Sequence, residues 1–354
     1  MTDQPTFKIA DTVFGISDDV FIIAEAGVNH NGNMDNAIAL VDAAAASGAD
    51  AIKFQTFTPE LLVAPDAEKG NYQVKTTGSD EGQFAMLAAL QLSGKQFAVL
   101  AERCRQKNIL FLTTPFDVEA MKSFDDLGVS VVKLSSGDIT NYQLLDAAAK
   151  STLPVILSTG MSTLEETTAA VHFLRSRNCK SLAILHCNSA YPTPAEDANL
   201  RILITLKNTF PCVIGFSDHT LGHHLSCAAV AMGARILEKH FTLDKAMPGP
   251  DHVASLDVEE LDKFVACVRD TSRALGNGNK YPTPSELENI KIGRRGIYWK
   301  SGLDAGHAIT EEDLICLRPA GRGIEASEFF NLIGSKIVRT VKNGTPVQKQ
   351  DFSS

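Results

Sequence analysis

Residues Val20–Asn31, VFIIAEAGVNHN, are the most informative about the fold, because an apolar run ends directly in Glu25 and polar residues follow. The run Val20–Ala24 is short and does not alternate with polar residues, which is typical of a strand buried on both faces of a parallel sheet. Seven further runs have the same character: Ala51–Phe54, Ile109–Leu112, Val129–Leu134, Pro154–Leu157, Leu182–Leu185, Cys212–Phe216 and Arg235–Leu237.

Amphipathic stretches separate these runs, so the chain reads as eight strand–helix units in series. Such a series predicts an α/β fold, either a closed barrel or a long doubly wound sheet. No glycine-rich dinucleotide-binding motif follows the first run, which favours a (β/α)8 TIM barrel. Ser93 and Ser162 stand where helix N-caps belong, and Glu165 would complete a capping box with Ser162.

The chain is too long for a barrel alone, and three segments are expected: a barrel at 1–276, a linker at 277–290 and a small β-rich domain at 291–354. The last segment contains two similar stretches, Gly306–Leu314 and Gly344–Phe352. They indicate either an internal pseudo-twofold repeat or a chance likeness of two turns. Residues 58–92 separate the second run from its helix, and a connection of that length is usually functional, often a lid.

Composition excludes several classes of protein. The formal net charge is −9, which argues against a nucleic-acid partner. No apolar run is long enough to span a bilayer, and the N-terminus lacks the pattern of a signal peptide. The seven cysteines are scattered without a CxxC pair, so a disulfide framework or structural zinc site is not expected, and a reducing cytoplasm fits best.

Each predicted strand ends in polar residues, and in a barrel these ends share one face. Lys53 and Lys133, with several hydroxyls, suit a phosphate and a carboxylate held together; ion pairs with Glu25 or Glu238 are the alternative. His219 and His240 end neighbouring strands and could hold a divalent cation, although a hydrogen-bonded structural histidine is the commoner outcome.

The motifs at these strand ends resemble the sialic acid synthase family, which includes N-acetylneuraminate, legionaminate and pseudaminate synthases. The matching stretches cover nearly the whole predicted barrel: AEAGVNHNG (24–32), AIKFQTF (51–57), TTPFD (113–117), KLSSGD (133–138), ILSTGM (156–161), LHCNSAYPTPAED (185–197), GFSDHTLG (215–222), EKHFTLDK (238–245) and GPDHVASL (249–256). The tail resembles the antifreeze-like (SAF) domain that follows the barrel in this family.

The resemblance implies a role for each matching residue. His219 and His240 correspond to the ligands of a divalent metal, Mn²⁺ or Mg²⁺. The phosphoenolpyruvate pocket corresponds to Lys53, Thr114, Lys133, Ser136, Ser158, Ser189 and Ser217. The sugar-facing and acid–base groups correspond to Glu25, Gln55, Tyr191 and Asp251, with Glu25, Lys53, Lys133 and Asp251 expected to carry the catalysis.

Two departures leave assignments open. One branch of the family has an asparagine where this chain has Ser189, so either Asn188 or Ser189 could reach the phosphate. The segment after the Arg318-Pro319 pair is one residue longer than in the family, so Arg318 or Arg322 could serve the sugar's acyl group; the retained Arg-Pro pair favours Arg318.

The function implied is condensation of phosphoenolpyruvate with N-acetylmannosamine and water, giving N-acetylneuraminate and phosphate. The alternative is a legionaminate or pseudaminate synthase that uses a 2,4-diacetamido-6-deoxy hexose. A synthase for phosphorylated aldoses is less expected because no second basic cluster is visible, and a non-catalytic sugar-binding barrel less still. The resemblance also implies a domain-swapped homodimer in which the tail completes the partner's site. The composition predicts no nucleic-acid or membrane partner.

Overall fold

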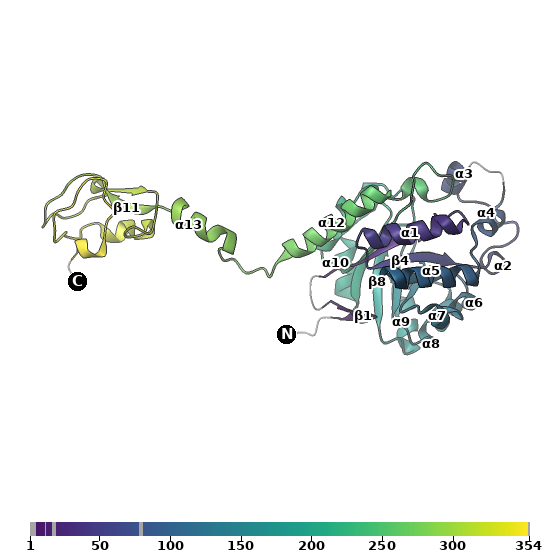
Figure 1. The fold of residues 1–354 in the computed structure, drawn as a ribbon. Helices are drawn as coiled ribbons and strands as arrows, with labels where there is room; N and C mark the ends of the chain where they lie inside the picture. The colour runs from purple at the N-terminus through teal and green to yellow at the C-terminus, as the bar shows by residue number, and fades with distance from the viewer. Residues whose placement is uncertain (1–4, 11, 16–18, 78–80, 353–354) are drawn as a thin grey trace. The chain divides into compact units, whose positions relative to one another are not determined.

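The computed structural model describes residues 5–10, 12–15, 19–77 and 81–352. The chain divides into two compact units, residues 1–276 and 277–354 (Figure 1). Each unit is described by itself.

The first unit is built on eight parallel strands, which confirms the predicted barrel. The strands are β3 (Phe21–Gly27), β4 (Ala51–Thr56), β5 (Leu110–Pro115), β6 (Val132–Leu134), β7 (Val155–Ser158), β8 (Leu182–Cys187), β9 (Val213–Asp218) and β10 (Ile236–His240). Their order is β5-β4-β3-β10-β9-β8-β7-β6, and β5 lies against β6, so the sheet closes on itself. All eight strands overlap the apolar runs identified in the sequence.

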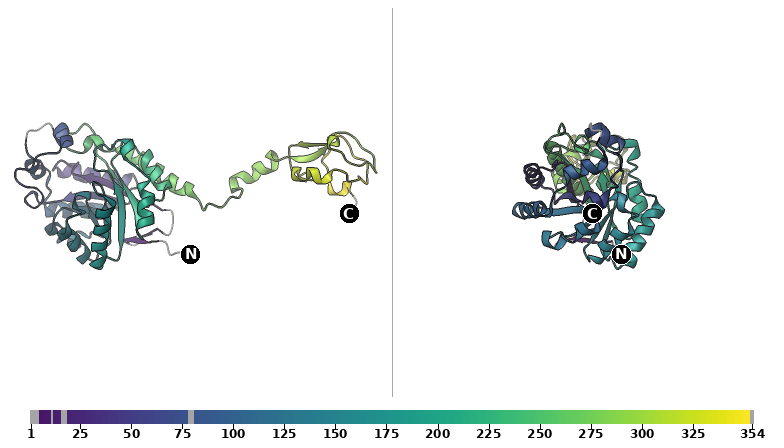
Figure 2. Two further views of the ribbon diagram at one scale, coloured as in Figure 1. Left: turned by 180° about the vertical axis from the view of Figure 1, so that it is seen from behind. Right: turned by 90° about the vertical axis from the view of Figure 1, so that its right-hand side faces the viewer.

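Helices cover the outer face of the sheet (Figure 2). They are α1 (Met34–Ala46), α5 (Gly94–Lys107), α6 (Val118–Met121), α7 (Phe124–Leu127), α8 (Tyr142–Lys150), α9 (Leu164–Ser176), α10 (Ile202–Thr209), α11 (His224–Ala231) and α12 (Val258–Leu275). Ser93 caps α5 in a capping box with Gln96, as predicted for that serine. The prediction for Ser162 is wrong by one residue, because Thr163 caps α9 and Glu166 completes the box.

A small hairpin that the sequence did not predict fills the N-terminal end of the barrel. It pairs β1 (Phe7–Ile9) with β2 (Thr12–Phe14). Phe7, Ile9 and Phe14 are buried against the inward-facing residues at the starts of the strands, such as Phe21 and Ile236. This apolar plug leaves the opposite end of the barrel, where the strands finish, as the end that can hold a ligand.

The connection at 58–92 is folded rather than extended. It contains three short helices, α2 (Pro59–Leu62), α3 (Asn71–Thr77) and α4 (Gln83–Leu90). Val28, Phe57, Met86 and Leu90 form a separate buried apolar cluster there. The segment is therefore anchored to the barrel rim by its own small core.

Among the described residues, no single helix is both long and apolar enough to cross a bilayer. Helices α4 and α5 pass that test only together, as a pair bent by 51°. The apolar face of α5, including Phe97 and Leu100, is buried in the barrel core, which accounts for its composition.

The first helical elements of the second unit are a 3-10 turn at Pro284–Glu286 and helix α13 (Leu287–Gly293), so part of the segment expected as linker is helical. Strands β11 (Gly296–Trp299) and β12 (Leu314–Leu317) pair antiparallel. The remainder is turns and isolated bridges around a core that includes Trp299, Ile309 and Val347.

An internal pseudo-twofold relates the two halves of this unit at an offset of 38 residues (344 − 306 = 38). The N–H of Gly306 donates to Ile337 O, and the N–H of Gly344 donates to Trp299 O. The bridge Ala308↔Lys336 has its counterpart in Tyr298↔Pro346. Each residue of one contact is 38 positions from its counterpart in the matching contact. The similarity of the two stretches is therefore a structural repeat rather than chance.

Candidate active site

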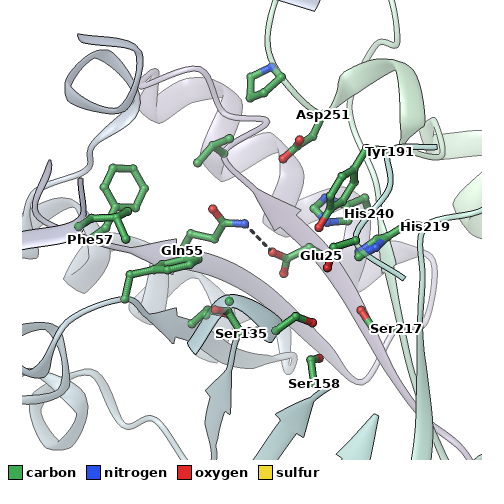
Figure 3. A pocket seen from close by; sticks show the side chains of 18 of the residues that line it. Glu25, Gln55, Phe57, Ser135, Ser158, Tyr191, Ser217, His219, His240 and Asp251 are labelled. Atoms are coloured by element: carbon green, nitrogen blue, oxygen red, sulfur yellow. Dashed lines mark hydrogen bonds between the residues drawn. The ribbon is translucent and has the colours of Figure 1, made fainter. Parts of the chain in front are cut away.

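A cavity of about 400 Å³ opens at the C-terminal ends of the strands (Figure 3). It brings together most of the residues expected from the sequence: Glu25, Lys53, Gln55, Thr114, Lys133, Ser136, Ser158, Ser189, Tyr191, Ser217, His219, His240 and Asp251. The strand register explains part of this convergence, since His240 pairs with Glu25 and Glu25 with Lys53 across three neighbouring strands.

Two lysines and two glutamates form the charged floor of the cavity. Lys53 Nζ lies 2.7 Å from Glu25 Oε2 and 3.7 Å from Glu238 Oε2, and Lys133 Nζ lies 3.4 Å from Glu238 Oε1. Ser217 donates to Glu238 Oε1 at 2.9 Å. Both ion pairs considered from the sequence are therefore present, and they lie inside the cavity rather than away from it.

The two carboxyl groups differ in pKa because the nearby lysines outweigh the effect of burial at Glu238 but not at Glu25. Removal from water raises the pKa of Glu25 to about 7, although Lys53 opposes this shift. Burial also acts on Glu238, but Lys133 and Lys53 outweigh it and lower the pKa of that carboxyl to about 2. One carboxylate thus stays ionised near neutral pH, and the other can take up and release a proton.

A cluster of hydroxyls surrounds Lys133. Its Nζ donates to Ser158 Oγ at 2.8 Å, and the backbone N–H of Gly160 donates to Ser136 Oγ at 2.9 Å. A Cβ at Gly160 would lie 2.4 Å from Ser189 Oγ and 2.8 Å from Ser136 Oγ, so only glycine fits between these hydroxyls. An ammonium group with several hydroxyl and N–H donors is the chemistry that holds a phosphate.

His219 and His240 lie side by side at one end of the cavity, with ring centroids 5.2 Å apart. His219 Nδ1 lies 2.6 Å from the backbone O of Asn188, which orients the ring and directs Nε2 away from that carbonyl. His240 Nδ1 is buried without a hydrogen-bond partner among the described residues. Among the residues that the structure describes, no group of three or more His, Cys, Asp or Glu side chains is arranged to hold a metal. The pair therefore fits a divalent cation only if substrate and water supply the remaining ligands.

Gly27 allows Glu25, Gln55 and His240 to approach one another. Its φ is +52°, and a Cβ there would lie 3.3 Å from Glu25 Oε1 and 3.4 Å from both Gln55 Nε2 and His240 Cε1. Gln55 Nε2 donates to Glu25 Oε1 at 3.3 Å. The bulge between Glu25 and Gly27 thus sets the carboxyl at the centre of the site.

Asp251 also lines the cavity, and it lies above the histidine pair in the view of Figure 3, on the side away from Ser158. Burial raises the pKa of its carboxyl to about 6. Ser255 Oγ donates to the backbone O of Asp251 at 2.7 Å, and Asn29 Nδ2 donates to Ser255 Oγ at 2.9 Å. Asn29, which the sequence did not single out, therefore holds the loop that carries Asp251.

The two assignments left open by the sequence differ in position. Ser189 lines the cavity. Asn188 is not among the lining residues, and its side chain donates to Asp197 O. Arg318 and Arg322 both belong to the second unit, where Arg322 borders a surface hollow beside Gly321 and Gly323.

Glu238 was considered from the sequence only as an ion-pair partner, yet it lines the cavity. Alternation along β10 was the available signal, because residues two apart in a strand share a face. Glu238 and His240 point inward, while the intervening Lys239 forms an ion pair with Asp218 at 3.0 Å.

Comparisons with known proteins cover both units. A model described as the NeuB family matches residues 40–280, and one described as the SAF domain matches residues 294–353. The chain is 44% identical over 335 residues to the N,N′-diacetyllegionaminic acid synthase of Legionella pneumophila, covering 94% of each protein. It is 34% identical over 342 residues to the N-acetylneuraminate-9-phosphate synthase of Mus musculus, covering 94% of this chain and 93% of that protein.

A solved structure has a similar fold. The N-acetylneuraminic acid (sialic acid) synthetase of Leptospira borgpetersenii, in complex with citrate, superposes with a TM-score of 0.71 at 36% identity. The match covers 81% of this chain and 95% of that one.

Proposed function

The chain belongs to the NeuB family, and we propose that it condenses phosphoenolpyruvate with a 2,4-diacetamido-6-deoxy hexose and water, giving a legionaminate-type nonulosonate and phosphate. The predicted family, an enzyme of the nonulosonate synthase type, and the barrel followed by an SAF domain are confirmed. The observation that supports the proposal is the cavity itself. There the hydroxyl cluster around Lys133 adjoins a histidine pair and two carboxyl groups, one with a raised pKa and one with a lowered pKa.

The chemistry divides between these groups. Lys133 and the hydroxyls of Ser136, Ser158 and Ser189 hold the phosphate, so that C3 of phosphoenolpyruvate faces the aldehyde of the open-chain sugar. His219 and His240 would hold a divalent cation, which when bound would supply Lewis-acid polarisation of the aldehyde. Holding two substrates in register in this way supplies much of the rate.

Glu25 is the group that manages protons. As C3 attacks, C2 becomes electron-poor and water adds there. Glu25 takes the proton of that water, which its pKa of about 7 allows near neutral pH. The proton taken by Glu25 can pass to the alkoxide formed from the aldehyde, which becomes the new hydroxyl. Collapse of the hemiketal phosphate, with loss of the C2 hydroxyl proton, releases inorganic phosphate with its bridging oxygen and leaves the keto acid.

Two legionaminic acid synthases, at 44% and 42% identity, support the diacetamido acceptor. N-acetylmannosamine, the acceptor favoured from the sequence, is the second candidate, supported by the likeness to the sialic acid synthetase. Among the described lining residues the lysines are Lys53 and Lys133, and both are paired with carboxylates. No further lysine among them is free to bind a second phosphate, which supports an unphosphorylated acceptor.

Three further features belong to the proposal. The metal is Mn²⁺ or Mg²⁺, as the family resemblance implies, and the carboxylate and other oxygen donors near the two histidines suit both ions. The protein is a homodimer whose tails are exchanged, with Arg318 reaching the acyl group of a sugar in the partner's barrel. The reaction takes place in the cytoplasm, where scattered thiols stay reduced.

A substrate panel tests the proposal. The purified protein is incubated with phosphoenolpyruvate, Mn²⁺ and one acceptor: the diacetamido-6-deoxy hexose, N-acetylmannosamine, or a phosphorylated aldose. Released phosphate and product mass are then measured. Turnover with the diacetamido sugar at the highest kcat/KM supports the proposal, and preference for a phosphorylated aldose refutes it.

A further inference from the structure

One side of the cavity is apolar, in contrast to the charged floor. It is formed by Phe57, Leu62, Met86 and Leu90, referred to here as the apolar wall. Phe57, Met86 and Leu90 are buried together with Val28 in their own cluster, and Leu62 packs against it. All four wall residues come from the end of β4 and the helices α2 and α4, so one segment supplies the whole surface.

The polar residues that this segment adds to the cavity are uncharged. They are Gln73 and Gln83, and no acidic or basic side chain among the described residues of 57–90 lines the cavity. Gln73 is held in place because its Oε1 accepts the backbone N–H of Gly70 at 2.9 Å. The segment therefore offers apolar surface and amides, and no group for a phosphate or carboxylate.

The position of the wall determines which part of an acceptor meets it. Phe57 and the histidine pair lie at opposite ends of the cavity in Figure 3, with Gln55 and Glu25 between them. The aldehyde carbon must lie beside the histidines and the phosphate cluster for bond formation. An open-chain hexose then extends past Glu25 and Gln55, and its C6 end reaches the apolar wall.

On the basis of the proposed function, we propose that the apolar wall binds the C6 methyl of a 6-deoxy acceptor and selects it over the 6-hydroxy counterpart. A hydroxyl placed against these four apolar side chains loses water, and the side chains themselves offer it no hydrogen-bond partner. Discrimination of this kind reaches about 10- to 100-fold in kcat/KM, because a hydrophobic pocket rejects an added hydroxyl only moderately.

The test uses two acceptors that differ only at C6, namely 2,4-diacetamido-2,4,6-trideoxymannose and 2,4-diacetamido-2,4-dideoxymannose. The wild-type enzyme is expected to prefer the 6-deoxy sugar by about 10-fold or more in kcat/KM. Leu62→Asn places an amide in the wall and is expected to lower that preference about tenfold, with little change in KM for phosphoenolpyruvate. Leu87→Gln, which alters another half-buried lining residue, is expected to change the preference in the same direction.

Leu61→Asn is the matched control. Leu61 is next in the chain to Leu62 but is 55% exposed and is not among the residues that line the cavity. It is expected to leave the preference unchanged. If both acceptors are turned over and Leu62→Asn and Leu87→Gln keep the wild-type preference, the inference about the wall is overturned while the proposed function stands. If neither diacetamido sugar reacts but N-acetylmannosamine does, the proposed acceptor is overturned and the inference with it.

Discussion

Replacement of Glu25 by glutamine is the most informative single change, because it tests both the proposed role of this carboxyl as a base and the effect of its burial on stability. Its Oε2 lies 2.7 Å from Lys53 Nζ, and its Oε1 accepts from Gln55 at 3.3 Å. The amide keeps the shape of the side chain but cannot take a proton. A general base contributes about 10²- to 10⁴-fold to rate, so kcat is expected to fall by at least 10².

The pH dependence follows from the pKa of Glu25, which burial raises from 4.5 to about 7. A base must be ionised, so wild-type kcat/KM should rise with pH through about 7, and this limb should disappear in Glu25→Gln. The same shift affects stability with a definite sign. The folded state binds the proton more tightly than the unfolded state, so the free energy of unfolding falls as pH rises from 4.5 to 7. A difference of about 2.5 pKa units corresponds to about 3 kcal/mol.

Two measurements test this reasoning together. The first is kcat/KM between pH 5.5 and 9 for the wild type, Glu25→Gln and the exposed control Glu165→Gln. The second is the urea midpoint at pH 5 and at pH 8, where the wild type and Glu165→Gln should lose more stability than Glu25→Gln. A variant that keeps the acidic limb near pH 7 would falsify the assignment of Glu25 as the base. A wild-type pH dependence of stability that persists unchanged in Glu25→Gln would show that another group titrates.

Three further outcomes are expected. His219→Ala should lose about 10² or more in kcat, and chelation should abolish wild-type activity until Mn²⁺ is restored; full activity of the variant in chelator contradicts the metal role. Gly160→Ala should raise the KM for phosphoenolpyruvate about tenfold or more without changing that for the sugar, because the new methyl displaces two hydroxyls; equal effects on both KM values would indicate a general distortion. Glu25→Ala and Arg318→Ala should each be nearly inactive, but co-refolding in equal amounts should restore roughly a quarter of the sites if tails are exchanged, and none if each tail serves its own barrel.

The barrel was readable from the sequence because its strands are uninterrupted apolar runs, and such runs are buried whatever their neighbours are. The polar residues that follow each run were readable for the same reason, since the barrel brings all strand ends to one face. His219, His240 and Lys133 needed no further information to be placed on that face.

Other features depend on contacts that a linear pattern does not contain. The hairpin β1–β2 is too short to show a period, and its role appears only when Phe7 and Phe14 are seen inside the barrel. The place of Glu238 in the site was missed because a carboxylate near lysines is equally expected to form a purely structural ion pair. The apolar wall was missed because residues 58–92 were interpreted only as a lid, and the separate packing of Met86 and Leu90 becomes visible only in the fold.

The pseudo-twofold of the second unit has a consequence for how that unit comes apart. The N–H of Ile337 donates to His307 O, and the N–H of Trp299 donates to Thr345 O, so both bonds run between the two halves and each half completes the backbone of the other. Neither half retains these partners when the other melts. Hydrogen exchange at Trp299 and at Ile337 should accordingly be governed by the same opening event, with the unit behaving as a single cooperative block rather than as two independent ones.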